Sequence, residues 1–518
     1  MLKTLTVRNL TSVRLSLSSV EHFIHSASST KSLASNLTTL VKCVIPGRKK
    51  QTNAGIPETA TPTSRDEVDI ELEPFRTYTT KIQIDPFQTL RLTIQGEDDS
   101  SWRVDVPTPS DASTPLVPLS TSQGYEFTAI YNDETFVLTL FDTTDMSNWM
   151  HAFPNKTPLS ALSLPGTHNS PTCYPALPSV RCQAVSITKQ LENGVRFLDV
   201  RVQINDVDKG ANSDSMELVH SAFPISLLGS VKMKTFVEEV YDFLDEHPNE
   251  TIIMSLKREG RGSGTDAIFS DRLLKYYTAA RPQRWHTQFG IPTLGEVRGK
   301  IILLRRFELS ETLQHDAQTK GGFGIDATNW ADNTPNYLGG DIQIQDFYQV
   351  TDTENIDKKI QYVCEHYERA GAAVHPIGAP STATEGPKQP LFINFLSASN
   401  FWKPGCWPDK IAAKMNPAIT QFLCEEHDIG DQGVDAPGQE AAGDGGLGVV
   451  VCDWVGENDD WDLVRAIVGM NSRLLLRLQL QAAGNGENGD SYGAVMRMGG
   501  RAAQGWGHRG GRDARSTR

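Results

Sequence analysis

Apolar and polar positions alternate in two parts of the chain, and each part has its own pattern. Over residues 75–143, short runs such as "LRLTIQG" and "TFVLTLF" alternate or run apolar between Gly, Asp, Asn and Pro. Residues 1–24 alternate in the same way. Runs of this length between turn residues are typical of β-strands. We therefore expect a β-rich, sandwich-like domain over residues 1–145.

Three stretches carry too little apolar content to pack. Residues 46–72 are polar and rich in Pro, Thr and charge, residues 426–446 are acidic and Gly-rich, and residues 483–518 are rich in Gly and Arg. Such compositions do not bury enough apolar surface to offset the entropy of ordering. They predict a flexible insertion in the first domain, a disordered loop in the second and a disordered tail.

From about residue 147 the apolar runs become continuous and recur between helical stretches. Eight runs are candidate strands: "ALSL" 161–164, "RFLDV" 196–200, "ELV" 217–219, "TIIMSL" 251–256, "IILLR" 301–305, "DIQIQ" 341–345, "FINFL" 392–396 and "GVVVC" 448–452. Consecutive apolar positions suit parallel strands that are buried on both faces. Between two of these runs, Phe236, Val240 and Leu244 recur at helical spacing.

Strand and helix thus alternate over most of residues 147–475. This order predicts an α/β fold, a (β/α)8 TIM-type barrel that follows the β-rich domain. Residues 202–216 are too short and too polar for a crossover helix, so we expect an irregular barrel wall there.

Charge and composition exclude several classes of function. The formal net charge is −14, whereas nucleic-acid binders gather Lys and Arg against phosphate, so we expect no nucleic-acid partner. No stretch approaches the roughly 18 apolar residues of a membrane span, and the first residues lack the apolar centre of a secretory signal. We expect a cytoplasmic protein that meets membranes only peripherally.

The cysteines show no metal-binding or redox pattern. The seven are Cys43, Cys173, Cys182, Cys364, Cys406, Cys424 and Cys452. They form no CxxC pair or other zinc-like spacing, and an odd number does not suggest a disulfide framework. We expect a reducing compartment, no zinc set and no thiol chemistry.

The chemistry of a barrel lies at the carboxyl ends of its strands. The residues that end or follow the predicted runs are His168 with Asn169, Asp199 with Arg201, His220, Lys257, Arg306, Asp346, Asn394 with Ser397, and Asp453. Each alone has a structural explanation, such as a hydrogen-bonded histidine or a helix cap. Strand ends are otherwise mostly Gly, Pro, Asn and Ser, so this many ionisable ends favour a catalytic face.

Two histidines, an arginine and several carboxylates suggest acid-base chemistry on a phosphoryl group. One imidazole, with a pKa near ~6.5, can accept a proton from an attacking hydroxyl while another donates a proton to the leaving oxygen. An arginine matches the charge of the non-bridging phosphate oxygens.

Eight blocks of this sequence resemble, in order and spacing, the X-domain barrel of bacterial-type phosphatidylinositol-specific phospholipase C. They are "LPGTHNSPTCY", "GVRFLDVRVQ", "LVHSAF", "NETIIMSLKRE", "GKIILLRRF", "IQDFYQV", "FINFLSAS" and "VVVCDW". The resemblance spans roughly residues 147–471. It implies a fungal-like member of the family with an extra N-terminal β domain.

The resemblance implies a metal-independent phosphodiesterase that needs no cofactor. It would cleave phosphatidylinositol, or a glycosyl-phosphatidylinositol anchor, to diacylglycerol and inositol 1,2-cyclic phosphate. His168 would be the general base on the inositol 2-hydroxyl, oriented by Asp453. Arg201 would bind the phosphate beside Asp199, and His220 would protonate the diacylglycerol oxygen. The inositol pocket would be lined by Lys257, Arg306, Asp346 and Tyr348.

One position departs from the bacterial pattern, because Asn169 stands where that family usually has aspartate. A neutral amide there would weaken proton donation. In the calcium-dependent relatives an Asn after the histidine is a calcium ligand, which raises the alternative of a calcium-dependent enzyme. That alternative needs a second carboxylate two residues beyond Asp199, where this chain has Arg201. A cation beside a guanidinium is electrostatically unfavourable, so we expect no metal.

The stretch "SNFWKPGCWPDK" follows the seventh predicted strand and carries Phe401, Trp402 and Trp407. In the resembling family, rim aromatics touch the lipid interface, and Trp suits that layer. The alternative is that these rings cap the barrel core. The expected partner is a membrane surface that contains phosphatidylinositol; the sequence indicates no protein partner.

Two other functions remain open from the sequence. The first is a weakly active or inactive phosphoinositide-binding protein, in which Asn169 has relaxed the chemistry. The second is cleavage of another phospholipid, as in sphingomyelin-cleaving relatives, which rely on a magnesium carboxylate cluster that Arg201 disfavours.

Overall fold

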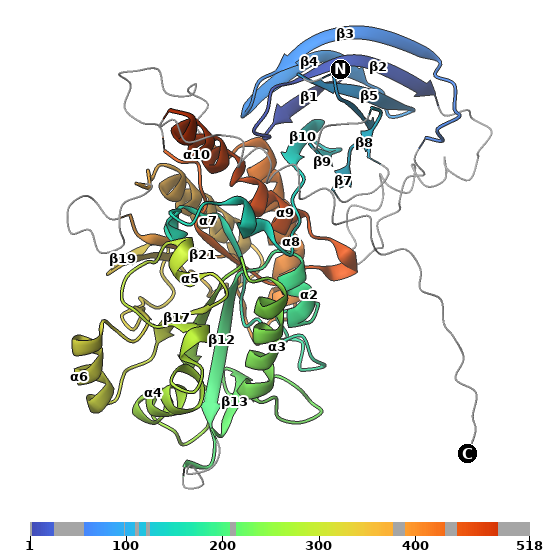
Figure 1. Cartoon of the computed structure of the whole chain (residues 1–518). Helices are drawn as coiled ribbons and strands as arrows, with labels where there is room; N and C mark the ends of the chain where they lie inside the picture. The colour runs from blue at the N-terminus through green and yellow to red at the C-terminus, as the bar shows by residue number, and fades with distance from the viewer. Residues whose placement is uncertain are drawn as a thin grey trace, which may run out of the picture.

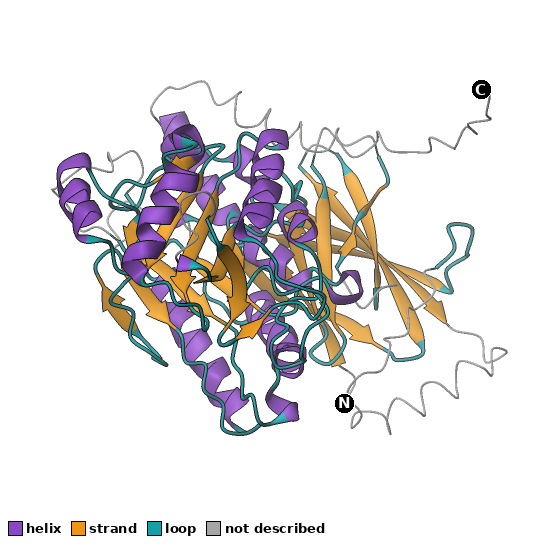
Figure 2. Cartoon of the chain, turned by 90° about the horizontal axis from the view of Figure 1, so that it is seen from below, coloured by secondary structure: helices purple, strands orange, loops and turns teal. Residues whose placement is uncertain are grey.

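The computed structural model describes residues 3–24, 56–97, 99–108, 113–120, 125–207, 214–376, 389–429 and 443–484. Figure 1 shows two β-sheets formed by the first part of the chain, at one end of the molecule, and a larger α/β part that follows them. Viewed from below, helices pack around the large sheet while the first part is almost all strand (Figure 2). We consider the two parts in turn.

The first part consists of two five-stranded sheets. One has the order β4 (Arg76–Ile84), β1 (Lys3–Asn9), β10 (Val137–Asp142), β9 (Phe127–Asn132) and β7 (Thr114–Pro115). The other has the order β3 (Ser64–Leu72), β2 (Leu15–Ile24), β5 (Gln88–Gly96), β6 (Ser101–Val106) and β8 (Val117–Pro118). Apolar side chains of both sheets, such as Val7, Leu17 and Leu92, form one buried cluster between them. The strands predicted from alternation are therefore present.

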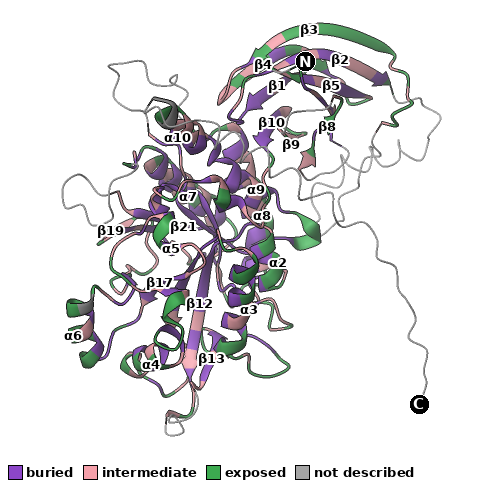
Figure 3. Cartoon of the chain, in the orientation of Figure 1, coloured by how far each residue is buried: buried purple, intermediate pink, exposed green. Residues whose placement is uncertain are grey.

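The prediction of a flexible insertion over residues 46–72 is wrong for residues 64–72. Residues 64–72 form β3, which pairs antiparallel with β2 from Leu15↔Leu72 to His22↔Ser64. β3 is an edge strand whose side chains are mostly exposed (Figure 3), so its sequence is polar although its backbone is paired. Residues 46–55 lie outside the described residues.

The second part is built on a twelve-stranded sheet. Its main path runs β16 (Trp285–His286), β17 (Ile301–Arg306), β15 (Ile252–Arg258), β12 (Phe197–Ile204), β11 (Leu164–Thr167), β22 (Val449–Cys452), β21 (Leu391–Phe395), β20 (Ile342–Gln345) and β19 (Tyr337–Gly339). Off this path, β13 (Met216–His220) joins β12, β14 (Phe223–Pro224) joins β13, and β18 (Ile325–Asp326) joins β17. All the pairings from β16 to β20 are parallel.

Helices cover this sheet, as the alternation of strand and helix predicted. They are α2 (Ile187–Glu192), α3 (Met233–Glu246), α4 (Asp266–Leu273), α5 (Leu294–Val297), α6 (Glu311–Lys320), α7 (Asn355–Gly371), α8 (Pro408–Glu425), α9 (Asp462–Gly469) and α10 (Ser472–Gly484). The expected loop at 426–446 and tail at 483–518 fall mostly on residues 430–442 and 485–518, which are outside the described residues.

The expected closed barrel of eight parallel strands is not what the described residues form. The sheet curls, but no recorded pairing joins β17 or β18 to β20 among the described strands. The predicted strand at 217–219 lies in β13, which runs antiparallel to β12 because the connection of residues 205–215 is too short for a crossover. The predicted strand at 161–164 begins only at Leu164, after a short helical turn at Leu159–Ala161.

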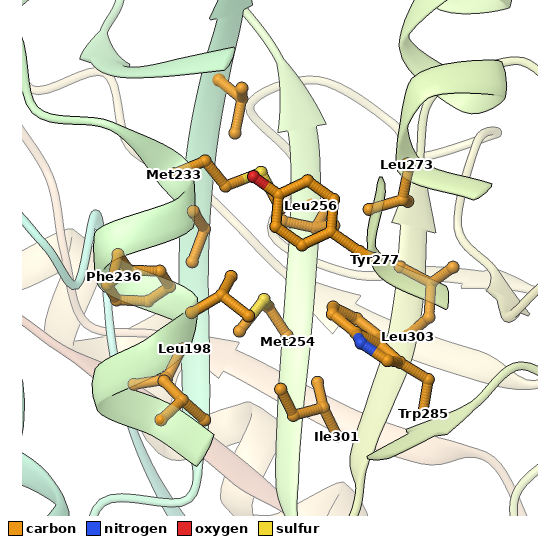
Figure 4. Close-up of a cluster of buried hydrophobic side chains, with 14 of the residues drawn as sticks. Leu198, Met233, Phe236, Met254, Leu256, Leu273, Tyr277, Trp285, Ile301 and Leu303 are labelled. Carbon is orange, nitrogen blue, oxygen red and sulfur yellow. The ribbon is translucent and has the colours of Figure 1, made fainter. Parts of the chain in front are cut away.

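Side chains alternate across the parallel strands and separate two cores. On β12, β15 and β17, residues such as Leu198, Met254 and Leu303 face outward, where α3 and α4 contribute Phe236 and Leu273 (Figure 4). The other face fills the inside of the curled sheet with a second buried cluster, which includes Phe197, Ile253 and Ile302. The same alternation of inward and outward side chains continues along each strand to the polar residues at its end.

The β-rich part packs on the helices that cover the outside of the large sheet. Leu10, Ile130 and Phe141 belong to the same buried cluster as Leu423 of α8 and Ile467 of α9. Glycine at 469 allows this approach, because a Cβ there would lie 2.4 Å from Phe141 Cδ1. Among the described residues, no helix is both long and apolar enough to cross a membrane.

Candidate active site

The inward-facing residues at the carboxyl ends of the strands lie side by side. Parallel pairing sets Arg201 opposite Lys257, and Lys257 opposite Arg306. On the neighbouring strands the same inward alternation continues from Gly166 to His168 and from Val451 to Asp453. Strand register alone therefore brings predicted residues from distant parts of the chain to one edge of the sheet.

The turn after β11 fixes the position of His168. Gly166 lets β11 lie close to β12, because a Cβ there would be 2.9 Å from Phe197 Cβ. The His168 backbone N–H then donates to the Cys452 carbonyl at 2.9 Å, and Asn169 adopts a left-handed φ of 42° that turns the chain away. Asn tolerates this conformation better than most residues.

His168 and Asp453 form a buried pair. The His168 Nδ1 atom lies 2.9 Å from Asp453 Oδ1, and Asp453 is 3% exposed. Burial lowers the pKa of His168, but the Asp453 carboxylate and Cys182 together raise it more, so the pKa lies well above its usual value. A carboxylate only accepts, so Nδ1 carries the proton and the lone pair of the neutral ring is on Nε2.

Asn169 contacts the other nitrogen of the same ring. Its Nδ2 group lies 3.0 Å from His168 Nε2 and donates to it, while its backbone N–H donates to Asp199 at 3.2 Å. Asn169 Oδ1 is buried and has no hydrogen-bond partner. An amide can donate to the neutral imidazole, or turn over and accept from the protonated ring, whereas the aspartate usual in the resembling family could only accept.

Asp199 anchors the cations of the site. This carboxylate is fully buried, and its oxygens lie 3.2 Å from Arg201 Nη2 and 3.3 Å from Arg306 Nη1. Burial raises the pKa of Asp199. The two guanidinium groups together have a larger, opposite effect and hold this pKa well below its usual value. The pKa of Arg201 is raised despite burial, because Asp199 and Glu259 face it.

His220 reaches the site on the hairpin formed by β13 and β14. Its ring centroid is 5.8 Å from that of His168, with the two planes at 89°. Its Nδ1–H donates to the Val180 carbonyl at 2.7 Å, which leaves Nε2 free to carry an exchangeable proton. Burial lowers the pKa of His220, and the Cys182 thiol raises it above the usual value.

A pocket of about 280 Å³ opens above these groups. The predicted residues that line it are His168, Arg201, His220, Lys257, Arg306, Asp346, Tyr348 and Ser397. Asp199, Asn169 and Asp453 are buried behind this lining, where they contact its members. Of the predicted strand ends, Asn394 alone is turned elsewhere: its amide bonds Gln345 and the Val363 carbonyl.

Apolar side chains follow two of the residues that line the pocket, Ser221 and Ser399. Phe401 stacks on Phe223 of the β14 strand at 5.3 Å and contacts Trp402 at 5.0 Å. Trp402 is 86% exposed, and Leu228, in the loop that follows Phe223, is 87% exposed. We call Phe223, Leu227, Leu228, Phe401 and Trp402 the rim cluster. Trp407 is half-buried and donates from Nε1 to the Phe401 carbonyl, so it supports the loop rather than extending the cluster.

Sequence reasoning missed three residues of this site. Glu259 bridges Arg201 at 2.9 Å and Lys257 at 3.1 Å, and these cations lower its pKa to about 2 against the effect of burial. Trp330 lies under the Arg306 guanidinium at 3.6 Å and donates to Asp346. Cys182, which we expected to be inert, lies buried beside both histidines. Glu259 could have been predicted from the sequence, because it continues the inward alternation of its strand beyond Lys257. Trp330 and Cys182 lie in loops.

The geometry defines a class of protein: an α/β sheet whose strand ends place two histidines and an arginine in one pocket suited to acid-base cleavage of a phosphodiester. Residues 155–307 match the family described as "Phosphatidylinositol-specific phospholipase C, X domain". The resemblance predicted from the sequence blocks is thus confirmed.

Two of the known proteins that are similar to this chain are bacterial enzymes. A "1-phosphatidylinositol phosphodiesterase" of Listeria monocytogenes is 29% identical over 287 residues, which cover 53% of this chain and 74% of the relative. A protein of the same name from Staphylococcus aureus is 25% identical over 291 residues, 53% of this chain and 83% of the relative. A solved structure of the S. aureus phosphatidylinositol-specific phospholipase C, from work on its membrane binding, has a TM-score of 0.47 and 22% identity over 63% of this chain and 97% of that one.

The pair of His168 and Asp453 makes a prediction about pH. The Asp453→Asn variant removes the negative charge that raises the pKa of His168, while the burial that lowers this pKa remains. The pKa of His168 should therefore be lower in the variant than in the intact protein. Histidine-selective NMR titration measures this directly. Asp332→Asn is the control, because Asp332 lines the same pocket but bonds Tyr348.

The same pair should contribute to folding stability in a defined pH window. A raised folded-state pKa stabilises the fold fully below the unfolded pKa of about 6.5, and this contribution is lost as pH rises through the folded value. The stability difference between the intact protein and Asp453→Asn should therefore shrink as pH rises above about 6.5, as measured by urea unfolding. A difference that grows with pH would contradict the assigned charge on His168.

Proposed function

We propose that this protein cleaves phosphatidylinositol, or a glycosyl-phosphatidylinositol anchor, to diacylglycerol and inositol 1,2-cyclic phosphate. The observation that carries the proposal is the pair of histidines, 5.8 Å apart, that face one pocket with Arg201 beside them. The names of the similar bacterial proteins support the choice of phosphatidylinositol as substrate.

His168 is the general base in this proposal. Asp453 holds the Nδ1 proton, so the lone pair on Nε2 can accept the proton of the inositol 2-hydroxyl. As that proton leaves, the hydroxyl oxygen forms a bond to phosphorus, and the ring becomes a cation that the Asp453 carboxylate stabilises. Because nucleophile and phosphorus belong to one molecule, the attack gains from proximity.

His220 is the general acid. Its Nδ1–H is engaged by the Val180 carbonyl, so the proton on Nε2 of the charged ring can pass to the diacylglycerol oxygen as the bond between phosphorus and that oxygen breaks. Arg201 faces the charge that develops on the non-bridging oxygens.

Recognition of the inositol ring is assigned to the charged lining of the pocket. Lys257, Arg306, Asp346 and Tyr348 supply donors and acceptors for ring hydroxyls, as the resemblance implies. We add Glu259, which holds Arg201 and Lys257 in place, and Trp330, whose ring supports the Arg306 guanidinium. A flat ring beneath a guanidinium restricts its orientation.

The residues present do not fit calcium, so we propose catalysis without it. Calcium takes about six to eight oxygen ligands, mostly carboxylates. Both oxygens of Asp199 face guanidinium groups, and Glu259 is shared by Arg201 and Lys257. Asn169 Oδ1 is a single neutral oxygen beside them. We expect no cofactor to take part.

The rim cluster is proposed as the contact with the lipid surface. It combines the almost fully exposed Trp402, in the loop after β21, with exposed Leu side chains that follow the hairpin of His220. Trp is favoured at the level of lipid headgroups. The place of action is proposed to be the cytoplasm, peripheral to the membrane; the six cysteines of the described residues are all free thiols, which suits a reducing compartment.

The function is tested by phosphorus NMR of the purified protein with phosphatidylinositol micelles in EDTA. We expect an inositol 1,2-cyclic phosphate signal, and a loss of rate of about 10²–10⁴-fold in His168→Ala, because one acid-base partner contributes that much. His315→Ala, which removes an exposed histidine on α6, is the matched control.

Two outcomes would contradict this account. If the cyclic phosphate signal is absent in EDTA and present in calcium, the metal-independent mechanism is overturned and Asn169 is a calcium ligand. If the cyclic phosphate signal is absent under both conditions while the protein still binds phosphatidylinositol, the binding-protein alternative is favoured.

The rim cluster makes a separate prediction. Trp402→Ala and Leu228→Ala should each weaken binding to phosphatidylinositol vesicles while leaving turnover of a soluble, short-chain substrate unchanged, as measured by vesicle sedimentation. Phe87→Ala is the control, since Phe87 is 59% exposed but lies in the β-rich part. Equal loss of vesicle binding in all three variants would show that exposed apolar area anywhere suffices.

A further inference from the structure

Three potential metal ligands meet at the floor of the pocket. The ligand atoms of His168, Cys182 and His220 all lie within 4.8 Å of one another. The Cys182 Sγ atom is 3.7 Å from His220 Nδ1, and Cys182 is fully buried. Within the described residues this is the only such group of three His, Cys, Asp or Glu side chains. The proposed reaction uses the two histidines and gives Cys182 no part.

The donor set has the chemistry of a zinc site. Zn²⁺ binds thiolate sulfur at about 2.3 Å and imidazole nitrogen at about 2.0–2.1 Å, with tetrahedral geometry. Two such ligands of one ion lie about 3.3–3.6 Å apart by that geometry. The 3.7 Å between Cys182 Sγ and His220 Nδ1 is close to this value, and the other ligand atoms lie within 4.8 Å of one another. Calcium and magnesium prefer oxygen ligands and have none in this set.

The surroundings of His168 already match those of a metal ligand. A metal-ligating histidine usually donates its other ring N–H to a carboxylate or a backbone carbonyl. Asp453 accepts from His168 Nδ1, so Nε2, which faces the neutral amide of Asn169, can take the ion. On His220 the nitrogen beside Cys182 is Nδ1, so an ion there would replace its hydrogen bond to the Val180 carbonyl.

The local charges also suit a divalent cation. A Cys182 thiolate and the Asp453 carboxylate together balance two positive charges. Arg201, the fixed cation nearest the site described above, is itself neutralised by Asp199 and Glu259. Because His168 and His220 line the open pocket, a small ion can reach the site from solvent.

We propose that His168, Cys182 and His220 form a binding site for Zn²⁺ that switches the enzyme off reversibly. The ion takes the lone pair of His168 Nε2 that would otherwise accept a proton, and its coordination by His220 replaces the proton that makes that ring an acid, so the base and the acid are lost together. The inhibition rests on the proposed function, whereas binding of the ion does not.

Binding is tested with Co²⁺ as a spectroscopic substitute for Zn²⁺, on the full chain in chelator-free buffer. We expect a thiolate-to-cobalt charge-transfer band that one equivalent of Zn²⁺ abolishes. The band should be lost in Cys182→Ser and kept in Cys364→Ser, a matched loss of a thiol on α7. A wild-type protein without the band, or a band that survives in Cys182→Ser, would overturn the site. The wild-type spectrum decides this even if the variant does not fold.

Inhibition is tested by the rate of phosphatidylinositol cleavage, with each protein compared with its own zinc-free rate. Micromolar Zn²⁺ should inhibit the wild type and Cys364→Ser, EDTA should restore both, and Cys182→Ser should need at least about tenfold more Zn²⁺. Calcium at the same concentration should have no effect. Equal sensitivity of Cys182→Ser and wild type would contradict the switch. A protein that binds Co²⁺ through Cys182 but cleaves no phosphatidylinositol would keep the metal site and overturn the proposed function instead.

Discussion

The register of the parallel strands is the constraint on which the site depends. It sets Arg201, Lys257 and Arg306 next to one another, three cations along one edge of the sheet. Such a row would repel itself without the buried carboxylate of Asp199, which faces Arg201 and Arg306, and Glu259, which pairs with Arg201 and Lys257. The result is a fixed array of cations that suits a phosphodiester and that already engages the carboxylates of Asp199 and Glu259.

The same register explains how the two histidines come to differ. His168 follows a central strand and is backed by the carboxylate of Asp453 from the neighbouring strand. His220 lies on a hairpin outside the parallel sheet and is backed by a neutral carbonyl. The carboxylate stabilises the cation that His168 becomes when it accepts a proton, and the carbonyl fixes His220 so that its other nitrogen can release one.

Much of this arrangement could be predicted from the sequence, because apolar runs predict strands and alternation then carries an inward side chain to the end of each strand. His168, Arg201, Lys257, Arg306, Asp346 and Asp453 all follow this rule. The rule also found His220 but not the direction of its strand, since nothing in residues 202–216 indicates that the chain turns back antiparallel. It fails for β3, where an exposed edge strand has the composition of a loop. Cys182 was not foreseen because it joins the histidines through a loop, at a spacing that matches no metal motif.

The division of labour between His168 and His220 is the central claim, and a change of leaving group tests it most directly. A sulfur leaving group needs no proton, so a phosphatidylinositol analogue whose diacylglycerol oxygen is replaced by sulfur should bypass the acid. His220→Ala should then lose about 10²–10⁴-fold on the oxygen substrate and at least tenfold less on the sulfur analogue, while His168→Ala loses equally on both. Equal losses of His220→Ala on the two substrates would contradict the role of His220 as the acid.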